Sequence, residues 1–288
     1  MWLWLFLFIA RPPLPAVEAP VPLPTAAACE PGPAAMACVP GGPFWRGRDD
    51  GPSNERPRQQ IWLQTYYMDR TEVTFAAYQA CVRRGKCRPA RPIYSDFNRP
   101  RQPMVAMTWF DARDYCRAVG KHLPTEAEWE KAARGPDGDL YPWGNEPATC
   151  ARAVIQDGRG RSCGLPKAGL ARLADVGRTL EVPARPAYRY GVHDLIGNAW
   201  EWVADWGGAD YRPIAAQTVN PLGLCDGADN CLLSKEKVLR GGSWYWDASY
   251  ATATFRRLYG PHNKPTSHFG FRCAASVQEV QRGLGGQP

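Results

Sequence analysis

The sequence has little that would hold zinc or bind a nucleic acid. It contains no pair of cysteines in CxxC spacing and four scattered histidines, so we do not expect a zinc site. Its positive charges are also dispersed. The net charge of +7 comes from arginines spread along the chain without a basic run, which favours solubility and weak attraction to acidic surfaces over nucleic-acid recognition.

The sequence also has few residues that would form a non-haem iron site or an activated serine nucleophile. A non-haem iron site needs two histidines and a carboxylate, and of the four histidines (His122, His193, His262 and His268) only the last two lie close together in the sequence. Ser243 follows Gly-Gly and lacks the GxSxG pattern of an activated serine. We therefore expect neither iron nor a serine nucleophile.

The N-terminus has no apolar run long enough to span a bilayer. Trp2 to Ala10 is apolar and has the length of a signal-peptide core, although no Lys or Arg precedes it. A proline-rich stretch follows to about Thr25. We predict that 1–28 is a signal-like segment and tether, that the mature protein has no transmembrane span, and that it is secreted, periplasmic or attached to the cell envelope.

Ten cysteines support an oxidising compartment. Four pairs are close neighbours in the sequence, and Cys116 and Cys273 are left as a distant pair. The close pairs are Cys29 with Cys38, Cys81 with Cys87, Cys150 with Cys163, and Cys225 with Cys231. Cys29 also follows three alanines in a loose lipoprotein-like pattern, so its lipidation is the alternative to a disulfide.

The chain is long enough for one substantial core, which we place at 29–277, with a flexible tail at 278–288. Its 28 glycines and 28 prolines indicate loops and short elements. A PGG turn at 40–42 should open a hairpin, and 61–69 alternates as one strand. Helices are predicted at 74–84, from a cap at Thr108 to Gly120, and from a cap at Thr125 to Gly135. A strand should precede the Gly-Gly turn at 241–242, a strand or an extended segment should follow it, and 268–276 should form a last strand.

The stretch from Gly191 to Trp206, GVHDLIGNAWEWVADW, fits neither a strand nor a helix pattern. Its acidic and amide oxygens suit a hard cation such as calcium, and its tryptophans need a large core.

The succession PGGPFWRG, EVTFAAYQAC, MTWFDARDYCRAVGKHLPTEAEWEKAARG, YPWGNE, YGVHDLIGNAWEWVADW, LRGGSWYWDASY and FGFRCAAS resembles the formylglycine-generating enzyme, or sulfatase-modifying factor, family over about 39–276. The resemblance implies an α+β fold related to C-type lectins, loop-rich, disulfide-stapled and stabilised by calcium. Members of this family oxidise a sulfatase cysteine to formylglycine with O2 and copper, and others serve different or no catalytic roles. The resemblance also implies a bridge between Cys116 and Cys273.

The family's calcium pattern falls on the side chains of Asp194 and Glu201 and the carbonyls of Gly197 and Ala199. The alternative is that the two acids cap turns and pair with arginines. A second calcium site of the family needs an Asn where this chain has Ala153, which should weaken or abolish that site.

The family's copper cysteines would fall on Trp246 and Ala251, and a substrate-binding arginine would fall on Ala253. Copper(I) needs soft sulfur ligands, so we do not expect copper. Ser243, Trp246 and Asp247 are the candidates for contacts in a ligand cleft, with Trp246 the best candidate for an exposed contact.

Two functions follow from these patterns. The first is a pseudoenzyme, a monomeric binding or accessory module for a peptide, a glycan or an envelope protein. The second is a divergent oxidoreductase of the family that uses other ligands or a partner chain.

Overall fold

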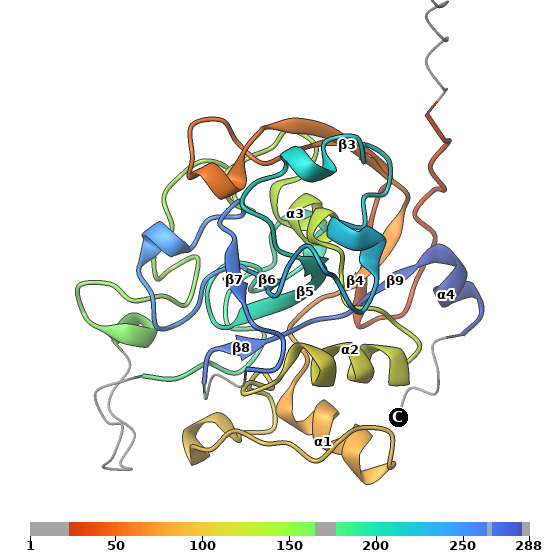
Figure 1. Ribbon diagram of the computed structural model, residues 1–288. Coiled ribbons are helices and arrows are strands. Elements are labelled where there is room, and N and C mark those ends of the chain that lie inside the picture. The colour runs from red at the N-terminus through yellow and green to blue at the C-terminus, as the bar shows by residue number, and fades with distance from the viewer. Residues whose placement is uncertain (1–22, 165–176, 264–266, 284–288) are drawn as a thin grey trace, which may run out of the picture.

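The chain folds into three small sheets joined by short helices and long loops (Figure 1). The structure, a computed structural model, describes residues 23–164, 177–263 and 267–283. The predicted signal-like run at 2–10 lies outside these ranges. Within them, no helix combines the length and apolar character needed to cross a membrane. The mixed, loop-rich architecture confirms the predicted α+β class.

Three sheets organise the described strands. The first has the order β1-β4-β9, the second pairs β2 with β3, and the third has the order β7-β6-β5-β8. All neighbours are antiparallel except β5 and β8, which run parallel. The strands are β1 (Met36–Val39), β2 (Gly42–Arg46), β3 (Gln59–Leu63), β4 (Tyr66–Asp69), β5 (Trp200–Trp206), β6 (Lys237–Arg240), β7 (Arg257–Tyr259), β8 (Phe269–Gly270) and β9 (Ala274–Ser276).

The first three helices begin where the sequence predicts, because each has a threonine cap. The side chains of Thr74, Thr108 and Thr125 each accept a hydrogen bond from a backbone N–H in the first helical turn. The last two caps are completed by an acidic side chain that accepts from the threonine N–H, which is the capping box expected from the sequence. The helices are α1 (Phe75–Arg83), α2 (Trp109–Ala118), α3 (Glu126–Arg134) and α4 (Val277–Gln281).

The PGG turn opens the first hairpin as predicted, because β2 begins at Gly42 and pairs with the next strand, β3, whereas β1 before the turn pairs with β4. One prediction for the first 70 residues is wrong. The alternating run at 61–69 is not one strand but two, β3 and β4, in different sheets. The chain passes between the first and second sheets twice, between β1 and β2 and between β3 and β4. The two crossings lie side by side, because the hydroxyl of Thr65 accepts a hydrogen bond of 2.9 Å from the N–H of Gly41. Two consecutive polar residues, Gln64 and Thr65, interrupt the alternation at this crossing.

The C-terminal predictions also need correction. The run 268–276 forms β8 and β9 in two different sheets, and the residues between them place Cys273 in the core. The tail does not fray at residue 278: α4 continues to Gln281 from a cap at Ser276, whose side chain accepts from the N–H of Glu279. Residues 284–288 of the predicted tail lie outside the described ranges.

Strand β5 explains the unusual composition of the Gly191–Trp206 stretch. It lies between β6 and β8, and it is buried along almost its whole length, so its residues do not alternate in polarity. Its tryptophans also hold loops in place: Trp202 Nε1 donates to the carbonyl of Met107 at 3.1 Å, and Trp206 Nε1 donates to that of Ala228 at 2.7 Å. The stretch therefore acts as the structural centre of the third sheet.

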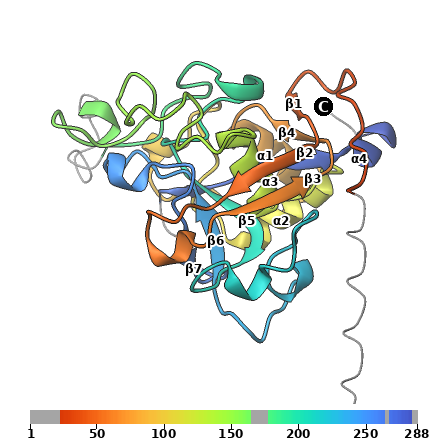
Figure 2. The same ribbon diagram turned by 90° about the horizontal axis from the view of Figure 1, so that it is seen from above.

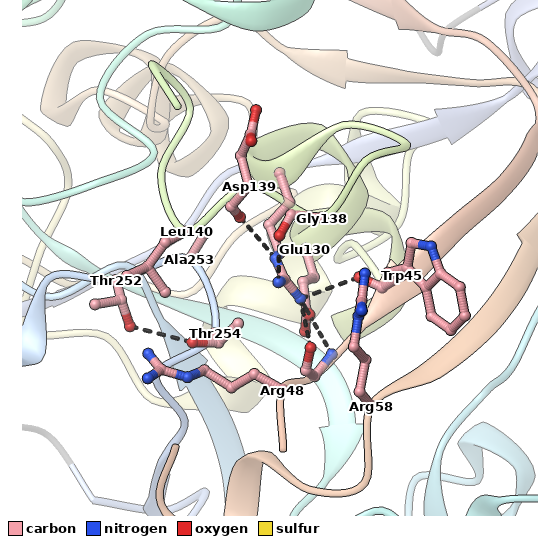
Figure 3. Close-up of polar contacts among 12 residues, drawn as sticks. Trp45, Arg48, Arg58, Glu130, Gly138, Asp139, Leu140, Thr252, Ala253 and Thr254 are labelled. Atoms are coloured by element: carbon pink, nitrogen blue, oxygen red, sulfur yellow. Dashed lines mark hydrogen bonds and ion pairs between the residues drawn. The ribbon is translucent and has the colours of Figure 1, made fainter. Parts of the chain in front are cut away.

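The inner side of α3 is charged and fully paired. Figure 2 shows β2 and β3 passing over this helix. Glu130 accepts hydrogen bonds from Arg134 at 2.9 Å and from Arg240 at 2.7 Å, and all three side chains are buried. Figure 3 shows the surroundings of Glu130, where the same Arg134 guanidinium also donates to the carbonyls of Trp45, Gly47, Gly138 and Asp139. Breaking one buried pair of this kind costs about 3–5 kcal/mol. The network therefore fixes α3 to the second sheet, through Trp45, and to the third sheet, through Arg240.

Candidate functional site

The segment after β6 carries the three cleft candidates, and the structure separates them. Ser243 is fully buried. Asp247 is exposed and caps the 3₁₀ turn Ala248–Tyr250, where its carboxylate accepts from the N–H of Ser249 at 2.9 Å. Trp246 is half-buried and packs among other aromatic rings. Of the three, Trp246 alone belongs to a larger group of side chains that reaches the surface.

Trp246 lies in what we call the aromatic–arginine cluster. Its ring centre is 5.1 Å from that of Tyr245 and 4.9 Å from that of Tyr250. The guanidinium carbon of Arg257 lies 5.3 Å from the Trp246 ring and 5.8 Å from the Tyr259 ring, within the range of cation–π attraction. All five side chains are half-buried, so each keeps part of its surface accessible.

This cluster contains more hydrogen-bond donors than acceptors. Arg257 makes no hydrogen bond or ion pair with any residue that the structure describes, and its pKa is lowered because burial disfavours the charged form. The indole N–H of Trp246 is buried and likewise finds no acceptor among the described residues. Buried polar groups are normally hydrogen-bonded, so these unpaired donors suit a ligand that supplies oxygen atoms.

The two histidines that lie close in the sequence occupy different environments. His268 lies beside the cluster, with its ring 5.0 Å from that of Tyr245. Burial, followed by the charges of Arg257 and Arg161, lowers the pKa of His268 to about 4, so it is neutral at physiological pH. His262 is exposed, and its ring packs against Phe110. Across the described residues, no group of three or more His, Cys, Asp or Glu side chains is arranged to hold a metal ion.

No thiol is available near Trp246. Ala251, the other position that corresponds to a copper cysteine, is fully buried. All ten cysteines of the sequence lie in disulfides, in the pairs indicated by their spacing: Cys29–Cys38, Cys81–Cys87, Cys116–Cys273, Cys150–Cys163 and Cys225–Cys231. Five bridges indicate a protein of an oxidising, non-cytosolic compartment.

Asp194 and Gly197 of the predicted calcium stretch adopt left-handed backbone conformations, with φ of 54° and 83°. The Asp194 carboxylate accepts from the N–H groups of Ala184 at 2.7 Å and Arg185 at 3.0 Å. A Cβ at position 197 would lie 2.6 Å from the carbonyl oxygen of Val154, so the site needs glycine for space as well as for conformation. The segment therefore makes a tight, buried turn around Asp194.

Glu201 is paired with an arginine. Arg272 donates to both of its oxygens at 2.7 Å, and Trp129 Nε1 donates to one of them at 2.8 Å. This matches the alternative considered from the sequence, in which the acid pairs with an arginine. Both oxygens of Glu201 therefore already accept hydrogen bonds from the protein.

A third acid, Glu72, was missed by sequence reasoning. It is buried, and one oxygen accepts from the Asn198 side chain at 3.0 Å, whereas its Oε2 has no hydrogen-bond partner in the described part of the chain. Burial, and then the charge of Asp194, raise the pKa of Glu72. Nothing in the local pattern EVT distinguishes this acid, because the fold alone brings it beside the later stretch.

Some contacts around Arg272 suit a calcium ion and others do not. The acids Glu72, Asp194 and Glu201 share one buried arginine, Arg272, and this excess of negative charge suits a cation. The unpaired Oε2 of Glu72 suits one as well. The hydrogen bonds of Glu201 do not, because its carboxylate is turned to Arg272. At the second family site, Ala153 is buried and supplies no side-chain oxygen.

Comparison with known proteins agrees with the fold and the motif order. The family model for the "Sulfatase-modifying factor enzyme 1-like domain" matches residues 23–277, so the chain belongs to this family. Over 65% of its length it is 36% identical to the formylglycine-generating enzyme of Bos taurus. Over 63% it is 34% identical to the "Inactive C-alpha-formylglycine-generating enzyme 2" of Mus musculus.

The chain spans about half the length of these relatives, 47% and 52% respectively. Among solved structures, PvdO from Pseudomonas aeruginosa superposes with a TM-score of 0.65 at 24% identity, covering 84% of this chain and 94% of PvdO. That likeness supports the fold. The relatives include both an enzyme and a protein named inactive, so family membership does not decide catalysis.

Proposed function

We propose that this protein is a member of the family without the copper-dependent cysteine oxidase centre, and that it acts as a binding or accessory module outside the cytosol. The observation that carries the proposal is the pairing of all ten cysteines in disulfides while Trp246 and Ala251 occupy the expected copper positions. An indole and a methyl group cannot replace two thiolates as copper ligands.

The binding surface in this proposal is the aromatic–arginine cluster. Its half-buried rings offer stacking area, while Arg257 and the Trp246 indole N–H offer donors that have no acceptor among the described residues. Aromatic rings combined with donors recognise ligands that have apolar faces and oxygen acceptors. We therefore assign a peptide carbonyl or carboxylate, or a glycan, as the ligand class, and a monomer as the working unit.

Calcium remains part of the proposal as a structural ion. Asp194 and the carbonyls of Gly197 and Ala199 would hold it, and Glu201 would join them as the fourth ligand only by turning from Arg272 toward the ion. The excess negative charge around Arg272 supports an ion there, and Glu72 would lie close to it. Its chemistry would be electrostatic, since calcium would neutralise buried carboxylates and fix the turn around Asp194.

Metal analysis and oxygen consumption test the proposal together. The disulfide-intact protein, loaded with copper(I) and then dialysed, should retain no stoichiometric copper and should consume no O2 with a cysteine-containing sulfatase peptide. The double variant W246C/A251C provides the control, because it restores two thiols at the family positions and should retain copper. Stoichiometric copper with turnover in the wild-type protein would instead establish the oxidoreductase alternative.

A further inference from the structure

The last residue of α1 and the loop after it carry a cluster of basic side chains, so the expectation of a chain without a basic run is wrong here. Five lie within nine residues: Arg83, Arg84, Lys86, Arg88 and Arg91. All five are exposed. We call this group the basic loop. Figure 1 shows α1 and the loop that follows it at the lower end of the molecule, beneath α2.

The backbone of the basic loop is held in place at three points. The Cys81–Cys87 disulfide ties it to the last turn of α1. The Tyr78 hydroxyl donates to the carbonyl of Arg88 at 3.0 Å, and the Gln79 side-chain amide donates to that of Ala90 at 2.7 Å. A fixed backbone lowers the entropic cost of binding, because the loop does not need to be ordered first.

The charges of the loop are almost uncompensated. Among the described residues, Asp111 is the one carboxylate within 4.0 Å of any of the five basic groups. It approaches Arg88, whose side chain is 76% exposed, at 3.8 Å. Such an exposed pair contributes little, so the loop presents a strong positive potential to solvent.

A groove with an apolar floor lies beside these charges. Its volume is about 560 Å³, and it is lined by Gln79, Pro89, Ala90, Arg91, Ile93 and Ala106. Ile93 is 72% exposed, although most other large aliphatic side chains of the domain are buried. Ala106 has a left-handed φ of 62°, which a non-glycine residue adopts only where its surroundings require it.

We infer that this groove and the basic loop form a docking site for an acidic peptide segment of a partner protein. An apolar side chain of the segment would enter the groove against Ile93, and carboxylates on either side would meet Lys86 and Arg91. A recess of this size suits one or two side chains, whereas a membrane would need a protruding apolar tip. This site differs from the aromatic–arginine cluster and does not depend on the function proposed for it.

Fluorescence anisotropy with a labelled peptide of sequence Asp-Glu-Asp-Leu-Phe-Asp-Glu-Asp tests the inference. Binding to the wild-type protein should be saturable and should weaken at least about tenfold between 50 and 500 mM salt. The variant K86E/R91E should weaken binding by at least about tenfold. I93S, or a peptide with serines in place of Leu and Phe, should weaken it several-fold.

The control variant K235E/R282E makes the same change in net charge at exposed residues elsewhere, and it should bind as the wild type does. An equal loss in the control would overturn the inference. Binding that I93S leaves unchanged would also overturn the inference, and so would the absence of saturable binding. Vesicles of phosphatidylglycerol and phosphatidylcholine serve as a competing probe, and tighter binding to them that K86E/R91E abolishes would assign the basic loop to a membrane surface instead.

Discussion

Arg272 and Glu201 form a two-point ion pair at the centre of the domain, with Nε and an Nη of the guanidinium each 2.7 Å from a carboxylate oxygen. Both side chains are buried, and they join β5 to the segment between β8 and β9 that holds Cys273 in the core. The pair uses the glutamate that the family resemblance assigns to calcium. It therefore connects the stability of the fold to the question of metal binding.

Removing one partner of this pair should be strongly destabilising. The variant R272M leaves Glu201 buried without its counter-charge, so we expect a loss of about 3–5 kcal/mol in the free energy of unfolding, measured in urea. The matched control R282M removes an exposed arginine and should change the free energy by less than about 0.5 kcal/mol. A small effect of R272M would mean that water reaches Glu201.

Calcium should raise the melting temperature if it binds beside Asp194. A ligand at 100 times its Kd adds about 2.7 kcal/mol to stability, so millimolar calcium should produce a clear rise, reversed by a chelator. D194A should remove the response, while E181A, which changes an exposed acid, should keep it. Magnesium at the same concentration is the ion control. An unchanged melting temperature in calcium would leave Glu201 solely as the partner of Arg272.

His122 should make stability depend on pH in the alkaline range. Its Nδ1 lies 2.9 Å from Glu279 and its Nε2 lies 3.3 Å from Glu128, linking α4 to the start of α3. Burial by itself lowers the pKa of His122, but the two carboxylates outweigh it and raise the pKa to about 10. Because the pKa is higher in the folded state, the contribution is complete below the ordinary value near 6.5 and disappears as pH rises through about 10.

The measurement is the difference in unfolding free energy between the wild type and H122Q from pH 6 to pH 10. This difference should shrink steadily toward pH 10. Glu279 should make stability depend on pH in the acid range. Burial by itself raises the pKa of Glu279, but the interactions with His122 and Ser276 outweigh it and lower the pKa to about 2. Its contribution should be lost as pH falls from about 4.5 toward 2. A difference that stays constant over the alkaline range would show that His122 is not protonated.

The long-range disulfide should matter more than the short ones. Cys116–Cys273 joins residues 157 apart, whereas Cys225–Cys231 joins residues 6 apart. In the chain-entropy model, the first contributes about 5 kcal/mol and the second about 2 kcal/mol. Urea unfolding of C116A/C273A and C225A/C231A should show this order. The reverse order would mean that the short bridge carries an additional packing role.

We expect Arg257 to contribute to ligand binding and to lower the free energy of unfolding slightly or leave it unchanged. Because it is half-buried without a partner among the described residues, R257M should leave the free energy of unfolding unchanged or raise it by up to about 1 kcal/mol. The same variant should lose affinity for any glycan or peptide that binds the aromatic–arginine cluster. A loss of more than about 1 kcal/mol in R257M would instead assign this guanidinium a structural role.

The sequence by itself determined the family, the α+β class, the three threonine-capped helices and the four close cysteine pairs. These features rest on local patterns: a cap and its N3 acid lie three residues apart, and the close cysteines are 6 to 13 residues apart. The tertiary structure decided what depends on distant contacts. It split 61–69 between two sheets, turned Glu201 to Arg272, placed Glu72 beside Asp194, and gathered Arg257 with Trp246. Burial and the pairing of charges set these relationships, and neither can be read from the order of residues alone.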